Sequence, residues 1–245
     1  MVHMTKLKHA ISETSPAATK ATAYVIGVKA DGAKSALAHS SLDAKFLASI
    51  NLESIGVSSA LGKTTKVSGP SSSVVLLIGL GPSKDLDSFR FIGGVAAREL
   101  GAAEHVVIDI PLKSAAETLA VFEGFLLGNY DFQTYKSKPV KRHLAKVTIV
   151  SKSKPKPAEL SEIETVVSAV HACRDLVNQP ANDLYPEVMT QHAKKASKNL
   201  PIKIKVWEEK DLVAAGLGGI HAVGKGSSRP PRLVKLEYKP AGAKV

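Results

Sequence analysis

Short apolar segments with strand character alternate along this chain with longer segments of helical periodicity. The clearest strand is residues 74–79, VVLLIG, a continuous apolar run that ends at a Gly-Leu-Gly-Pro turn. Apolar residues with helical spacing follow over 89–100 and stop at Gly101, and a second strand is predicted at 105–110, HVVIDI. A buried strand followed by a helix and another buried strand is typical of parallel β-α-β units. We therefore expect an α/β domain with a largely parallel or mixed sheet.

The same alternation continues through the rest of the chain. Further strands are predicted at 23–28, 145–150, 202–207, 220–223 and 233–238, and further helices at 42–50, 115–130, 160–178 and 186–198, with a short helix that Asp211 caps and Gly216 ends. The pattern breaks at 151–157, SKSKPKP, where lysines, serines and prolines replace periodic apolar residues. We expect four parts: a flexible segment at 1–20, an amino-terminal α/β domain at 21–150, a linker at 151–158, and a connector helix with the start of a second domain at 159–245.

Composition places the chain among globular proteins. Hydrophobic residues make up 44% of its 245 residues, which is enough to build a sizeable core. The longest apolar run, 74–80, is too short to span a bilayer, and the first 20 residues lack the apolar stretch of a secretory signal. The single cysteine, Cys173, excludes an intramolecular disulfide and a cysteine-cluster zinc site. These features predict a cytoplasmic location and no membrane partner.

The net charge of +11 is concentrated in one stretch. No acidic residue lies between Asp131 and Glu159, and this stretch is rich in lysine. Such a block can attract phosphate backbones, but its few aromatic residues and the lack of a known nucleic-acid-binding signature favour a solvated loop, an exposed strand and a linker. The alternative is a non-catalytic module that uses the basic stretch 136–156 for nucleic-acid binding or oligomerisation. Weak DNA binding is its first form, and the candidate residues are Lys136, Lys138, Lys141, Arg142 and Lys146.

Three further patterns do not indicate a functional site. Residues 219–225 match the first seven positions of a phosphate-binding loop, but Gly226 stands where a serine or threonine must meet magnesium. The eight histidines include no pair with metal-ligand spacing, so His221 is interpreted as a strand residue beside a glycine turn. Valines around Cys173 predict a helix face packed into a core. No catalytic or metal-binding residue is assigned.

Two motifs carry a family resemblance. Residues 176–186, LVNQPANDLYP, and 222–238, AVGKGSSRPPRLVKLEY, resemble the V-N-x-P-x-N-x-L-x-P and V-G-x-G-S-x-x-P-P-R-L elements at the entry to the catalytic domain of the leucyl (cytosol) aminopeptidase family. Residues 123–132, EGFLLGNYDF, resemble that family's E-G-x-x-L-x-x-Y-x-F helix. The resemblance covers most of the chain and is weakest over 1–19.

The resemblance implies a macro-domain-like α/β amino-terminal domain followed by the first elements of an α/β catalytic domain. Members of the family release amino-terminal residues from peptides with two divalent metals, commonly zinc or manganese, and homo-hexamers are expected for the intact enzymes. Their metal ligands, catalytic lysine and catalytic arginine lie beyond the L-E-Y element, so none is carried over, and Lys225 belongs to the earlier V-G-x-G-S element. We therefore expect this chain to be inactive alone, with strands 220–223 and 233–238 lacking partners.

Overall fold

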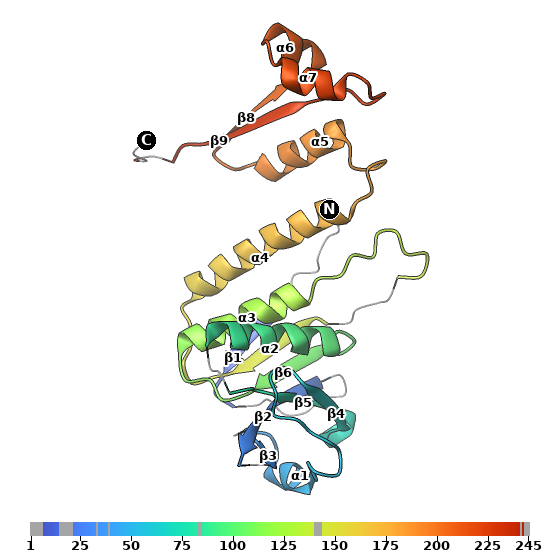
Figure 1. The fold of residues 1–245 in the computed structure, drawn as a ribbon. Coiled ribbons are helices and arrows are strands. Elements are labelled where there is room, and N and C mark those ends of the chain that lie inside the picture. The colour runs from blue at the N-terminus through green and yellow to red at the C-terminus, as the bar shows by residue number, and fades with distance from the viewer. Residues whose placement is uncertain are drawn as a thin grey trace. The chain divides into compact units, whose positions relative to one another are not determined.

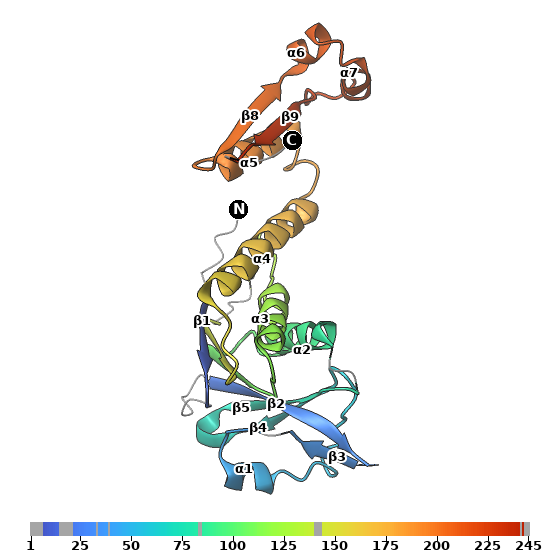
Figure 2. The same ribbon diagram turned by 90° about the vertical axis from the view of Figure 1, so that its left-hand side faces the viewer.

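A computed structural model describes residues 7–14, 22–32, 34–38, 40–82, 85–139, 144–240 and 242. The chain forms two compact units, Met1–Cys173 and Arg174–Val245. Figures 1 and 2 show the elements of each unit in chain order, from blue to red. The boundary falls inside the long helix α4, Pro157–Asn178.

The first unit contains a seven-stranded mixed sheet in the order β1-β7-β6-β2-β5-β4, with β3 paired to β2. Strands β1, β7, β6, β2 and β5 run parallel to their neighbours in this order, whereas β3 and β4 are antiparallel to β2 and β5. The strands are β1 Lys8–Ser12, β2 Thr22–Asp31, β3 Lys34–Leu37, β4 Thr64–Ser68, β5 Val74–Gly79, β6 His105–Asp109 and β7 Lys146–Val150. The predicted α/β class is confirmed.

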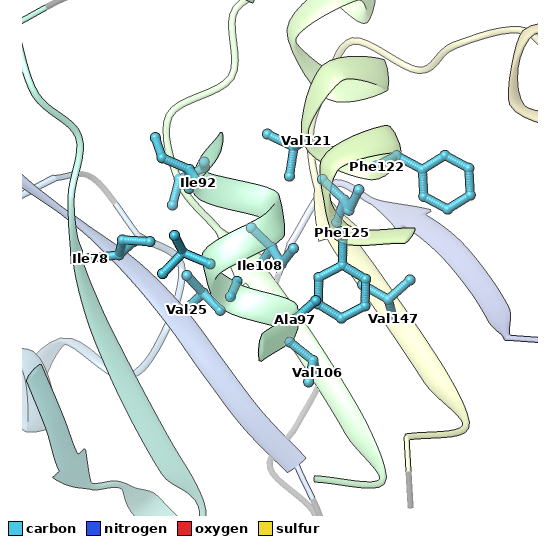
Figure 3. Close-up of a cluster of buried hydrophobic side chains, with 14 of the residues drawn as sticks. Val25, Ile78, Ile92, Ala97, Val106, Ile108, Val121, Phe122, Phe125 and Val147 are labelled. Atoms are coloured by element: carbon cyan, nitrogen blue, oxygen red, sulfur yellow. The ribbon is translucent and has the colours of Figure 1, made fainter. Parts of the chain in front are cut away.

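Helices cover both faces of this sheet. On one face α2, Leu86–Glu99, and α3, Ala115–Gly128, lie side by side, and on the other lies the short α1, Ala44–Ser49; a 3-10 turn, Pro70–Ser72, precedes β5. Figure 3 shows Val25, Ile78 and Ile108 of the sheet facing Ile92, Val121 and Phe125 of α2 and α3. Alternate residues of the same strands, including Tyr24 and Ile26, form a second buried cluster with α1. Both faces of the central strands are therefore buried, which explains their continuous apolar runs.

Residues 151–158 are fixed to the first unit, although their composition predicts a linker. Ser151 is buried, its N–H donates to the Ser12 carbonyl at 2.7 Å, and its hydroxyl lies 2.9 Å from that of Thr118. The first turns of α4 then pack on the core through Leu160, Ile163 and Val167. The first compact unit accordingly extends to Cys173, beyond the sequence-based limit at 150.

Two other expectations need correction in the first unit. Residues 8–12 of the supposedly flexible amino terminus form the edge strand β1 beside β7. Cys173 is exposed, and Val166 and Val170 on α4 are 50% and 38% exposed, so this helix face is not packed into a core as predicted. The buried face of α4 carries Val167 and His171 instead.

The second unit consists of α5, Pro186–Ser197, a two-stranded antiparallel sheet of β8, Ile202–Trp207, and β9, Leu233–Tyr238, and the short helices α6, Glu209–Ala214, and α7, Gly218–Gly224. The predicted strand at 220–223 is therefore wrong: these residues, including His221, lie in α7. The expectation that 233–238 lacks a partner is also wrong, because β9 pairs with β8 along its whole length. Asp211 is not the N-cap of α6 but its third residue, in a capping box with Glu208.

The second unit has a small core. The buried residues among its described part are Thr190, Ser197, Leu212 and Pro231. Val223 is 91% exposed, Tyr238 61% and Val213 57%, so large apolar side chains lie on its surface. Within the described ranges of both units, no helix has the length and apolar character needed to cross a membrane.

Candidate functional site

The two motifs of the second unit meet at Arg229. Its Nη1 donates a hydrogen bond to the carbonyl oxygen of Asn182 at 2.7 Å, and its guanidinium carbon lies 3.9 Å from the centroid of the Tyr185 ring. Asn182 and Tyr185 belong to the turn that ends at α5, where Pro186 takes the first helical position, as the sequence predicts. One arginine thus holds together two segments whose bonded residues are 47 positions apart.

A small pocket of about 160 Å³ opens beside this contact, lined by Tyr185, Glu187, Ser228, Arg229, Pro230 and Arg232. Arg232 is largely buried, with its side chain 16% exposed, and its Nη2 lies 3.8 Å from Glu208 Oε1. The P-P-R turn approaches α7 so closely that a Cβ on Gly224 would lie 2.6 Å from the Cβ of Pro231. The glycine and prolines of the second motif therefore have a packing role.

The chemistry of this pocket is that of a polar recess. Its lining offers two guanidinium groups, one carboxylate, one hydroxyl and one phenol, and includes no histidine, cysteine or lysine that could serve as a base or nucleophile. It can hold a small charged group.

Metal-ligating side chains are not gathered in the described ranges: no group of three or more His, Cys, Asp or Glu is placed to hold an ion there. His221 lies in α7 with its Nε2 3.6 Å from Glu209 Oε1. Lys225 is the C-cap of α7, and its N–H donates to the His221 carbonyl at 2.8 Å. Residues 219–225 are thus helix and helix cap, so they cannot cradle a phosphate as a loop would.

Three of the five candidate nucleic-acid-binding residues are described, two between α3 and β7 and one at the start of β7. Lys136 and Lys138 are exposed in this connection, and Lys146 is the exposed first residue of β7. Lys141 and Arg142 lie outside the described residues. Lys146 also affects His105 on the neighbouring strand, where burial, followed by the charge of Lys146, lowers the pKa of the imidazole.

The E-G-x-x-L-x-x-Y-x-F helix of the first unit is a structural element. Glu123 binds Arg90 of α2, Gly124 lies against the Arg90 backbone, and the Tyr130 ring packs 5.2 Å from His171 of α4. The sequence identifies the two motifs of the second unit but does not reveal the contact between them. No spacing rule relates Arg229 to Tyr185, so only the fold could show it.

Comparison with family models matches both units in order. Residues 25–139 match the model described as cytosol aminopeptidase family, N-terminal domain, and residues 171–245 match the model described as cytosol aminopeptidase family, catalytic domain. This chain belongs to the cytosol aminopeptidase family. The family assignment from the three motifs is confirmed, and the match at 171 lies close to the unit boundary at Cys173.

Individual relatives support the same family assignment. The probable cytosol aminopeptidase of Leifsonia xyli subsp. xyli is 35% identical over 196 residues, which cover 78% of this chain and 40% of that protein. The probable cytosol aminopeptidase of Streptomyces coelicolor is 36% identical over 267 residues, covering 96% of this chain and 52% of that protein. The chain thus spans about half or less of the length of these curated relatives.

Solved structures show the same fold. A mutant of tomato leucine aminopeptidase superimposes with a TM-score of 0.85 and 20% identity, covering 100% of this chain and 53% of that one. The bottromycin maturation enzyme BotP in complex with Mn superimposes with a TM-score of 0.71 and 27% identity, covering 91% of this chain and 46% of that one.

Proposed function

We propose that this chain supplies the amino-terminal domain and the opening of the catalytic domain of a metal-dependent aminopeptidase that releases amino-terminal residues from peptides. The observation that carries the proposal is the ordered match of both units to the two domain models of one family. The contact of Arg229 with Tyr185 and Asn182 supports it, because it joins the two motifs that open the catalytic domain. The homo-hexamer and the cytoplasmic location expected for the family are part of the same proposal.

We propose that the whole enzyme, and not this chain alone, binds two metals, zinc or manganese. BotP, a structural relative, is described in complex with Mn, which supports a metal-dependent family reaction. The donor set of a two-metal hydrolase is several carboxylates and other ligands around bridging ions, and the described residues of this chain do not assemble such a set. No metal ligand or catalytic step is therefore assigned to its residues, and the chain alone is proposed to be inactive.

A pair of proteins tests this division of roles. The 245-residue chain, assayed with leucine anilide and added zinc or manganese, should show no turnover above that of the metal alone. A chimera that joins this chain to the remaining half of the Streptomyces coelicolor relative should hydrolyse the substrate, and a chelator should abolish the activity. Chelator-sensitive turnover by the chain alone would contradict the proposed division. A folded but inactive chimera, with the unmodified relative active in parallel, would contradict the proposed function.

Weak DNA binding by the basic connection is a second candidate role, favoured by the exposure of Lys136 and Lys138 in a stretch that lacks acidic residues. Affinity for duplex DNA should fall steeply with salt, because binding would release counterions from phosphates. Charge reversal at Lys138, Lys141 and Arg142 should weaken binding equally for all sequences, as expected for phosphate contacts. Lack of DNA retention at low salt would remove this role.

A further inference from the structure

The two-stranded antiparallel sheet of β8 and β9 has two chemically different faces. Side chains alternate across a strand, so opposite residues of the two strands share a face. The pairs on one face are Ile202 with Tyr238, Ile204 with Leu236, and Val206 with Val234; the pairs on the other are Lys203 with Glu237, Lys205 with Lys235, and Trp207 with Leu233. We call the second set the lysine face. The charged residues are thus gathered on the lysine face; on the other face Ile202, Ile204 and Val206 are half-buried, whereas Leu236 and Tyr238 are 52% and 61% exposed.

Positive charges lie directly opposite each other on the lysine face. Lys205 pairs with Lys235 across the two strands, and Lys203 lies two residues before Lys205 on the same face. All three lysines are exposed. Like charges directly opposite in an antiparallel pair destabilise it. A bound anion would relieve this repulsion.

The lysine face carries one carboxylate, Glu237, which offsets only part of this charge. It lies 2.9 Å from Lys235 Nζ and 3.7 Å from Lys239 Nζ, so two lysines already share it. The hydrogen bond and charge of Lys235, with the charges of Lys239 and Lys203, hold the pKa of the Glu237 carboxyl below its ordinary value. The lowered pKa thus reflects the positive charge of the neighbouring lysines, which the single carboxylate of Glu237 does not neutralise.

An aromatic ring lies at the end of this row of lysines. Trp207 is the single tryptophan of the chain, and Lys205 Nζ lies 4.3 Å from its ring centroid. A hollow of about 470 Å³ adjoins the ring and is lined by Lys205, Val206, Trp207, Asp211, Ala214 and Ala215. A partly exposed aromatic ring beside lysines is the combination with which proteins stack bases and hold phosphates of single strands.

We propose that the lysine face of the β8–β9 sheet binds single-stranded nucleic acid, with phosphates at Lys203, Lys205 and Lys235 and a base against Trp207 at the adjoining hollow. An acidic peptide would match the lysines but would leave the ring and the hollow unused, so the aromatic ring favours nucleic acid. This surface is separate from the basic connection before β7 and does not depend on the peptidase reaction.

The single tryptophan provides a direct measurement. The purified 245-residue chain is titrated with oligothymidylate while the fluorescence of Trp207 is followed. Stacking should quench the indole, and the affinity should fall with salt with a log-log slope of about −2, from about −0.7 for each of three neutralised phosphates. Polyglutamate of matched charge should produce no comparable quenching. Equal quenching by polyglutamate, or no binding of the oligonucleotide at low salt, would overturn the proposal.

Matched variants locate the surface, with binding followed by the anisotropy of a labelled oligonucleotide. K203E combined with K205E should weaken binding about ten-fold or more. K194E combined with K195E makes the same charge change at exposed residues of α5, away from the lysine face, and should have a much smaller effect. Equal losses in the two double variants would show attraction to net charge alone and overturn the proposal.

Two substitutions of the ring separate stacking from folding. Trp207→Leu should weaken binding between about 5-fold and about 150-fold, the range for loss of one stacked base. Trp207→Phe keeps an aromatic surface and should retain most of the affinity. Unchanged binding in Trp207→Leu would exclude the ring from the site and overturn the proposal. The proposal would also be overturned if binding were lost only in the variant that combines K136E with K138E, on the basic connection before β7.

Discussion

Arg90 binds Glu123 through its side chain and packs against the neighbouring Gly124 through its backbone. Its Nε donates a hydrogen bond to Glu123 Oε2 at 2.5 Å, and Nη1 donates to Asp87 at 2.6 Å. The hydrogen bond with Glu123 is the largest cause of the raised pKa of the guanidinium. Helices α2 and α3 are thus joined at one point by an ion pair and by close backbone contact, which accounts for the E-G dipeptide of the family motif.

Gly124→Ala should destabilise the first unit. The new Cβ would lie 1.9 Å from the Arg90 carbonyl oxygen, so the two helices would have to move apart. Overpacking of this kind lowers the free energy of unfolding by about 1–3 kcal/mol, measured by urea unfolding with circular dichroism. Gly94→Ala is the matched control, because its Cβ would meet atoms no closer than 3.3 Å. Equal losses in the two variants would contradict the close contact at Gly124.

His105 should make stability depend on pH. Burial and the nearby Lys146 lower the imidazole pKa, so the folded state favours the neutral ring more than the unfolded state does. The unfolded chain then binds more protons as pH falls, and the contribution to stability, present above about pH 6.5, is lost progressively as pH drops below that value.

His105→Gln provides the measurement. The amide retains a polar group near Thr148 Oγ1, which lies 2.8 Å from His105 Nε2, but it cannot titrate. Urea unfolding at pH 7.5 and pH 5 should show a smaller decrease in the free energy of unfolding for the variant than for the natural chain. An identical decrease in both proteins would assign the pH dependence to other groups.

Arg229→Ala should loosen the turn before α5. The substitution removes both the hydrogen bond to the Asn182 carbonyl and the stacking on Tyr185. These contacts together stabilise the turn by about 1–2 kcal/mol, so amide hydrogen exchange over residues 182–190 should become about 5- to 30-fold faster. Lys225→Ala, at an exposed position of the same motif, should leave the exchange unchanged. Arg229→Lys should be intermediate, because it keeps the charge but loses the planar group.

Buried strands could be predicted because burial requires apolar residues in a regular pattern along the strand. Residues 74–79 form β5 with the predicted bounds, and the alternation at 202–207 predicts β8 equally well. The edge strands at 8–12 and 64–68 were missed because KHAIS and TTKVS bury too little apolar surface to form a clear pattern.

Other features depend on contacts that periodicity does not reveal. The segment 220–223, IHAV, was predicted as a strand but is helical, since a segment of four residues does not distinguish strand from helix. The composition of 151–157 predicts a linker, yet Ser151 and Ser153 find hydrogen-bond partners on neighbouring elements. The contact of Arg229 with Tyr185 likewise depends on how the chain folds back.

The two units should differ in resistance to trypsin, and the position of the first cuts tests where the first unit ends. A linker at 151–158 would predict a resistant core ending near Val150. In the structure, Lys154 pairs with Glu13 at 3.0 Å, Ser153 Oγ donates to the Lys113 carbonyl, and the start of α4 packs on the core. Cleavage requires local opening, which is rarer where backbone and side chains are fixed in this way.

We therefore expect early cleavage in the second unit, after Lys194, Lys195 or Lys198, which are exposed on or next to α5 and whose unit buries few described residues. The resistant fragment should retain 151–158 and end at Arg174 or beyond, as mass spectrometry of the digest would show. An early fragment ending at Lys152 would mean that this segment opens independently of the sheet. Equal resistance of both units would mean that the exposed Val213, Val223 and Tyr238 do not weaken the second unit.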